Sequence, residues 1–134
     1  MPADMTMSPD LSLLVWAIGL CFVQMLVSVL LVLPQVGLPA LAGNREGLPA
    51  FTGMAGRAIR AHRNMIENLV LFAALVLVAA VTGSANEMTA LGAQLFFWAR
   101  LVYAVVYLVG VPWLRTGVWA VSVVGLVLIF LQLI

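Results

Sequence analysis

Charged residues are scarce in this chain, and their scarcity limits what the protein can be. Only 8% of its 134 residues are Asp, Glu, Lys or Arg, whereas 65% are hydrophobic. A soluble domain carries roughly 25% charged residues, so this chain cannot cover a surface that faces water on all sides. Composition and length therefore predict one domain, residues 1–134, whose solvent is the lipid bilayer.

The chain also lacks the residues on which several other functions depend. A single cysteine, Cys21, excludes a disulfide within the chain, and no cluster of Cys, His and carboxylates has the spacing of metal ligands. The net charge is only +1 and no basic stripe is present, so nothing supports nucleic-acid binding. Met1–Asp10 contains no Lys or Arg, unlike the basic start of a secretory signal, so we expect no cleavable signal sequence.

Long apolar runs are what the chain has instead. A helix needs about 20 apolar residues to cross the hydrocarbon core, and only helices or closed barrels leave no backbone group unpaired in lipid. The short alternating segments of a barrel are absent, and Pro34 and Pro112 are expected to end the first and third runs. We predict an all-α integral membrane protein, a bundle of four transmembrane helices at about residues 11–33, 57–81, 88–111 and 116–134.

Arginine positions indicate the orientation, because cytoplasmic connections carry an excess of positive residues. The side that holds both termini and the turn between the second and third helices has no Lys or Arg. We expect the first and third connections in the cytoplasm and both termini outside a cytoplasmic (inner) membrane. The arginines on the expected cytoplasmic side are Arg45, Arg57, Arg60, Arg63 and Arg115.

Polar side chains crowd into the start of the second helix, in the stretch GRAIRAHRNMIENLVLF, residues 56–72. At about 100° per residue, most of them fall within one sector roughly 120° wide, whereas His62 points the opposite way. One face of the third helix and the start of the fourth are also polar. The sector holds Arg57, Arg60, Arg63, Asn64 and Glu67, the third helix contributes Arg100, Tyr103 and Tyr107, and the fourth contributes Arg115 and Thr116.

Ionisable groups inside a membrane by default mark function, because they are unfavourable there unless paired or hydrated. Glu67 could form a purely structural ion pair with Arg100 or Arg60, and for that pair the two interpretations stay open. The arginines nevertheless outnumber the carboxylate, and the surplus suits a polar anionic ligand that enters from the cytoplasm. Arg45 and Arg57 are expected to do no more than reach lipid headgroups.

At these residues the chain resembles the membrane-associated proteins of eicosanoid and glutathione metabolism, the MAPEG family. RAHRNMIEN, residues 60–68, fits the family pattern Arg-Ala-His/Gln-x-Asn-x-x-Glu, and Arg100-x-x-Tyr103-x-x-x-Tyr107 followed by Arg115 fits a second one. With four spans and a similar length, the resemblance covers nearly the whole chain. It implies a homotrimer of four-helix subunits that holds glutathione at subunit interfaces near the cytoplasmic side.

The resemblance also implies roles for single residues. Arg115 would stabilise the glutathione thiolate electrostatically, because the thiolate is the nucleophile and a free thiol has a pKa near 8.5. Glu67 would accept from the α-amino group, and His62 would reach a glutathione bound mainly to the neighbouring subunit. The remaining expected glutathione contacts are Arg60, Arg63, Asn64, Arg100, Tyr103, Tyr107 and Thr116.

Two departures from the family pattern shape the functional prediction. The gap from Tyr107 to Arg115 differs by a residue from the eicosanoid-synthesising branches, and Trp119 replaces a tyrosine of one branch. We therefore expect a glutathione-dependent transferase or peroxidase that acts on a small apolar electrophile dissolved in the membrane lipids. The alternative is a non-catalytic membrane trimer of the same fold that binds glutathione or another anion, or serves a structural or interaction role. A proton-coupled exporter is disfavoured, because residues 11–33 contain no acidic residue.

Overall fold

The computed structural model describes residues 7–48 and 50–134. Residues 1–6, which belong to the N-terminal segment in which we expect no cleavable signal sequence, lie outside the described residues. Four long helices in the described part are apolar enough to cross a membrane, which confirms the prediction of an all-α bundle with four spans. A fifth, short helix in the first connection was not predicted. The helices are α1 (Pro9–Val36), α2 (Leu38–Ala42), α3 (Gly53–Val81), α4 (Glu87–Val109) and α5 (Pro112–Leu133).

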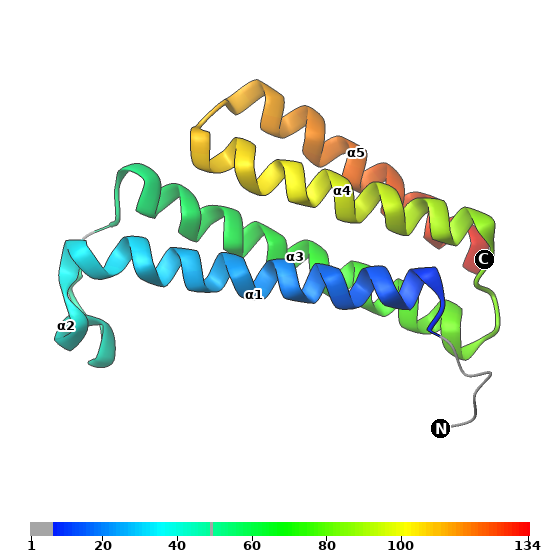
Figure 1. The fold of residues 1–134 in the computed structure, drawn as a ribbon, viewed down its shortest axis with the longest axis horizontal. Coiled ribbons are helices and arrows are strands. Elements are labelled where there is room, and N and C mark those ends of the chain that lie inside the picture. The colour runs from blue at the N-terminus through cyan, green and yellow to red at the C-terminus, as the bar shows by residue number, and fades with distance from the viewer. Residues whose placement is uncertain (1–6, 49) are drawn as a thin grey trace.

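The long helices form two antiparallel pairs, α1 with α3 and α4 with α5, and α4 packs on both members of the first pair (Figure 1). The α1–α3 and α4–α5 connections lie at one end of the bundle, and the start of α1 and the end of α5 lie at the other. The expected polar segments, which begin α3, end α4 and begin α5, are thereby brought to the same end.

The helix ends correct the predicted boundaries. α1 continues through Pro34 to Val36, and α3 begins at Gly53 rather than at residue 57. Transmembrane helices tolerate proline when neighbouring groups satisfy the freed backbone atoms. Pro112 begins α5 instead of ending the third span, because proline suits the first helical position, whose N–H has no partner within the helix.

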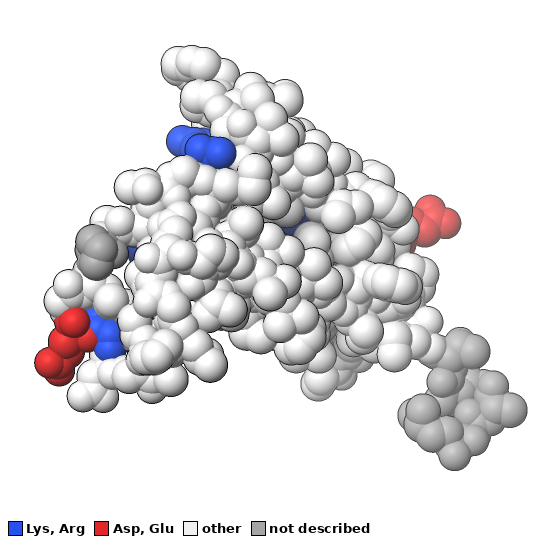
Figure 2. Space-filling view, turned by 60° about the vertical axis from the view of Figure 1, so that its left-hand side comes forward, with Lys and Arg blue, Asp and Glu red and all other residues white. Residues whose placement is uncertain are grey.

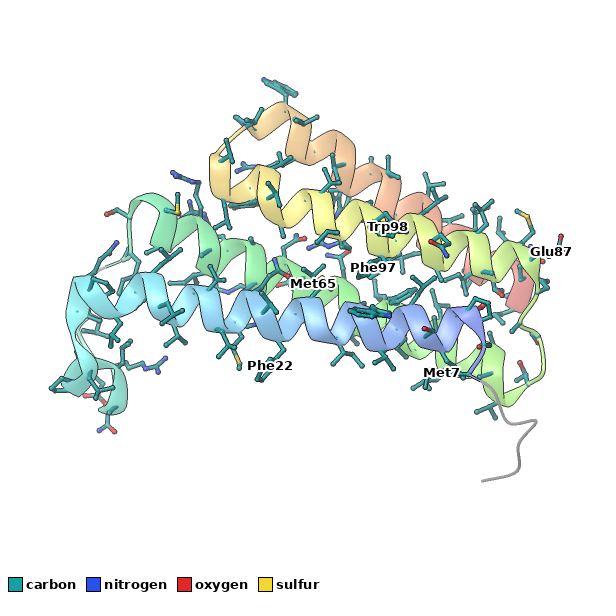
Figure 3. The ribbon with its side chains drawn as sticks, viewed as in Figure 1. Met7, Phe22, Met65, Glu87, Phe97 and Trp98 are labelled. Carbon is teal, nitrogen blue, oxygen red and sulfur yellow. The ribbon has the colours of Figure 1, made fainter. Side chains whose placement is uncertain are left out.

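The core of the bundle contains several large apolar side chains that pack against one another. The rings of Phe72 on α3 and Phe96 on α4 stack with centroids 4.1 Å apart. Met65 is fully buried beside them, whereas Phe22 points away from the bundle and is 56% exposed (Figure 3). Most of the surface drawn in Figure 2 carries no charge. The outward-facing apolar residues suit contact with lipid, and van der Waals packing holds the helices together.

Two glycines set the crossing of α4 and α5. A Cβ atom at Gly92 would lie 2.5 Å from the carbonyl oxygen of Gly125, and a Cβ atom at Gly125 would lie 2.5 Å from the carbonyl oxygen of Gly92. The second would also lie 2.9 Å from the backbone nitrogen of Phe96. Backbone atoms cannot move aside as a flexible side chain can, so the helices reach this separation only with glycine at both positions.

Both ends of α4 are capped by polar side chains. At its N-terminus the Asn86 side chain accepts from the backbone N–H groups of Met88 and Thr89, each at 2.9 Å. At its C-terminus Arg57 Nε donates to the carbonyl oxygen of Leu108 at 3.0 Å. Arg57 therefore does more than reach lipid headgroups, because its cation satisfies a carbonyl in the last turn of α4 and lies at the negative end of that helix.

Candidate functional site

Arg100 is the centre of the polar region, on the face of α4 that packs against α3. Its side chain is only 1% exposed, and its NH1 donates to Asn64 Oδ1 at 2.8 Å. Its guanidinium carbon lies 4.1 Å from the ring centroid of Tyr103, within the range of a cation–π interaction. Its Nε and NH2 are buried without a hydrogen-bond partner among residues 7–48 and 50–134. The guanidinium is thus held in place but only partly satisfied.

Asn68, one turn further along α3, holds the Asn64 amide in the position in which it accepts from Arg100. Asn68 Nδ2 donates to the backbone carbonyl of Asn64 at 2.8 Å and approaches Asn64 Oδ1 at 3.3 Å. Two N–H groups therefore converge on Asn64 Oδ1, which must be the oxygen of that amide. The i, i+4 spacing of the two asparagines on a helix produces this arrangement.

A second cluster lies beside the first and joins three helices. Arg60 Nε on α3 donates to the hydroxyl of Tyr107 on α4 at 3.2 Å. The guanidinium carbon of Arg115 on α5 lies 4.6 Å from the centroid of the Tyr107 ring. The rings of Tyr103 and Tyr107 are 5.5 Å apart, so the two clusters are continuous through the tyrosines.

A cavity of about 160 Å³ opens where α3, α4 and α5 meet. Arg115 is the only charged residue that lines it within the described part of the chain, and hydroxyl and amide groups provide most of the rest. Four of its five lining residues were predicted site residues, and Trp119 was not. The lining consists of Asn64, Tyr103, Arg115, Thr116 and Trp119. The cavity therefore offers a positive charge and several hydrogen-bonding groups in one small, open space.

Three predicted site residues of α3 do not join these clusters in the single chain. Arg63 and Glu67 are exposed, and His62 is partly exposed. The rotation of α3 about its own axis determines which of its polar residues reach the clusters. Arg57 and Asn64 lie at the edge of the polar sector that faces α4, whereas Arg63 and Glu67 lie at the opposite edge. The postulated pair of Glu67 with Arg100 is not formed, because Asn64 takes that place.

Two residues of the site were not among the predicted ones, although the sequence holds a signal for each. Asn68 follows Asn64 at i+4, and Trp119 follows Arg115 at i+4, so each shares a helix face with a predicted site residue. Within the described residues, no group of three or more His, Cys, Asp or Glu side chains could hold a metal ion. The polar region is suited to an anionic organic ligand by its arginines, amides and tyrosine hydroxyls.

Comparison with known proteins assigns the fold to a family. The model of the MAPEG family matches residues 13–134. A search of curated proteins and a search of solved structures each returned no match. The family match covers both polar motifs, all four spans and the residues that line the cavity. The chain therefore belongs to the MAPEG family.

Proposed function

We propose that this protein is a membrane-bound glutathione-dependent transferase or peroxidase that activates the glutathione thiol for attack on a small apolar electrophile dissolved in the bilayer. Membership in a family of eicosanoid and glutathione metabolism supports a glutathione-related or eicosanoid-related role in the membrane. The observation that carries the finer proposal is the cavity in which Arg115 faces Asn64 and Tyr103. It combines one fixed cation with neutral hydrogen-bonding groups, as the stabilisation of a thiolate requires.

The proposed chemistry begins with the loss of the thiol proton. A thiol with a pKa near 8.5 is mostly protonated at neutral pH, and a nearby cation shifts the equilibrium toward the thiolate. Arg115 cannot take up the proton, because a guanidinium stays charged, so the proton leaves to water on the open side of the cavity. In the transferase reaction the thiolate sulfur forms a bond to an electrophilic carbon, and the leaving group departs with the bonding electrons.

The other polar residues would bind and orient the tripeptide. Arg100 has two nitrogen atoms, Nε and Nη2, without a partner in the described chain, and a carboxylate would accept from both with favourable geometry. Glu67 would accept from the α-amino group. The cavity of about 160 Å³ is smaller than the about 300–1,000 Å³ of a typical ligand pocket. Glutathione would therefore extend beyond it, toward the exposed residues of α3 and a neighbouring subunit.

The homotrimer belongs to this proposal, because the exposed Arg63 and Glu67 and the partly exposed His62 then become part of sites shared between subunits. The orientation of the protein in the membrane is also part of the proposal. The end of the bundle with the α1–α3 and α4–α5 connections would face the cytoplasm, where glutathione is present. The protein would lie in a cytoplasmic (inner) membrane with both termini outside.

Glutathione binding and turnover in detergent-purified protein test the proposal. Calorimetry on wild type, Arg115→Ala and the matched control Arg45→Ala should show binding in all three, since Arg45 is exposed in the first connection, away from the cavity. Conjugation of glutathione to an activated aryl halide should be lost only in Arg115→Ala. Binding to wild type without turnover of aryl halides or organic hydroperoxides would favour the non-catalytic alternative. No glutathione binding to wild type would refute both forms of the glutathione hypothesis.

A further inference from the structure

A second cavity lies on the opposite side of α4 from Arg115, among α1, α3 and α4. It has a volume of about 210 Å³, and nine of its ten lining residues are apolar. Three buried alanines, Ala58, Ala61 and Ala104, provide the space, because any larger side chain at these positions would enter it. Ala61 also packs against Tyr103 and Tyr107, so this cavity and the polar cluster share a wall.

The tenth lining residue is a glutamine in the middle of a transmembrane helix. Gln24 on α1 is only 9% exposed, and its Oε1 is buried without a hydrogen-bond partner among residues 7–48 and 50–134. Ser28, one turn further along α1, donates its hydroxyl hydrogen to the carbonyl of Met25 at 2.8 Å, so this hydrogen is not available to Gln24 Oε1. An amide oxygen left without a hydrogen bond in an apolar medium is unfavourable, because it has lost its water partners and gained none. Gln24 is thus a polar group that the described chain does not satisfy.

Size and polarity together restrict what can occupy this cavity. A water molecule needs two to four polar partners to be held inside a protein, and among the described residues Gln24 is the only polar one in the lining. An apolar cavity of about 150 Å³ stays dry and takes up benzene, so a cavity of about 210 Å³ has room for one ring with a small substituent. Val23 and Val105 line it and are 54% and 58% exposed, which leaves an entry from the lipid side.

We propose that this cavity binds a small phenol-like molecule from the bilayer, with the ring among the aliphatic side chains and the single hydroxyl on the Gln24 amide. A hydroxyl both donates and accepts, so it can pair with either end of a carboxamide. A saturated acyl chain would fill part of the volume but would leave the amide unpaired. This assignment does not rest on the proposed function, because it concerns a different cavity and involves no glutathione.

Fluorine NMR with two matched probes tests the assignment. 4-Fluorophenol and 4-fluorotoluene have similar shapes, but only the first carries a hydroxyl. Each would be titrated, without glutathione, into wild-type protein in phospholipid nanodiscs, with empty nanodiscs as the baseline. Wild type should bind 4-fluorophenol more tightly than 4-fluorotoluene. The ratio of the two affinities should fall about three- to tenfold in Gln24→Leu, which is the effect of one hydrogen bond. The preference should be unchanged in Gln94→Leu, an exposed glutamine of α4 that does not line this cavity.

A second variant tests the location independently of the hydrogen bond. Ala104→Leu replaces a methyl group by an isobutyl group at the wall of the cavity and should abolish saturable binding of both probes. An unchanged phenol preference in Gln24→Leu would overturn the role of the amide. Binding that persists in Ala104→Leu would overturn the location. The absence of saturable binding to wild type would overturn the proposal as a whole and indicate that a lipid chain or a second subunit fills the cavity.

Discussion

The half-satisfied guanidinium of Arg100 leads to an unusual stability prediction. Asn64→Leu removes the acceptor for NH1 and leaves a charge that is 1% exposed with no hydrogen-bond partner in the described chain. A hydrogen bond to a charged group contributes about 1.5–3 kcal/mol, and a buried charged donor left without its acceptor is more unfavourable than a neutral one, for which the loss is about 1–3 kcal/mol. We expect Asn64→Leu to lower the free energy of unfolding by about 2–4 kcal/mol, toward the lower end because the Tyr103 ring remains.

Arg100→Met should behave in the opposite way, although it removes the larger side chain. It takes away two nitrogen atoms that have no partner in the described chain, together with the charge, and Asn64 Oδ1 keeps the approach of Asn68 Nδ2 at 3.3 Å. Replacing buried ionic groups by apolar ones of similar volume is often neutral or stabilising, by up to about 4 kcal/mol. We therefore expect Arg100→Met to leave the stability of the ligand-free protein unchanged or to raise it.

Reversible unfolding by sodium dodecyl sulfate in mixed micelles, without glutathione, measures both effects. The double variant should be about as stable as Arg100→Met alone, because Asn64 has little to bind once the guanidinium is gone. Glutathione at 100 times its dissociation constant should raise the stability of wild type by about 2.7 kcal/mol, and Arg100→Met should lose most of this increase. A larger destabilisation by Arg100→Met than by Asn64→Leu would refute the reasoning, since the guanidinium would then be satisfied in the ligand-free protein.

Three further substitutions test the packing and capping contacts, each by thermal denaturation in detergent. Gly125→Ala should destabilise by about 1–3 kcal/mol, because its new Cβ atom meets backbone atoms of α4; Gly117→Ala, whose Cβ atom would meet nothing within 4 Å, should be neutral. Arg57→Met should destabilise by about 1–2 kcal/mol through loss of the C-terminal cap of α4, and an equal effect of Arg45→Met would contradict this. Asn86→Ala should destabilise by about 0.5–2 kcal/mol, and no change would show that the N-terminal cap of α4 is dispensable.

The sequence sufficed for the fold because length and polarity decide whether a segment crosses a membrane. Four runs of about 20 apolar residues predicted four spans, and the structure and the family match confirm both the bundle and the family. The ends of the spans were less predictable. Proline stops one helix and starts another, so Pro112 could be assigned to either neighbour until the packing of α4 and α5 was known.

The sequence indicated which polar side chains would gather at one end of the bundle, but not which of them would pair; their role in ligand binding stays a prediction. Periodicity placed Arg57, Asn64 and Glu67 in one polar sector of α3, but it did not indicate which edge of that sector faces α4. The rotation of a helix about its own axis is determined by the packing of its neighbours, and this choice gave Arg100 to Asn64 and left Glu67 exposed. The apolar cavity beside Gln24 depends on three helices at once, so no pattern within one helix could have indicated it.

The most direct test of the central claim is the ultraviolet absorbance of the thiolate when glutathione binds at neutral pH. The claim is that Arg115, in its cavity among α3, α4 and α5, stabilises the thiolate. Wild type and Arg45→Ala should show a thiolate signal that saturates with bound glutathione, and Arg115→Ala should bind glutathione without it. A thiolate signal of equal size in Arg115→Ala, or bound glutathione that stays protonated in wild type, would contradict the account.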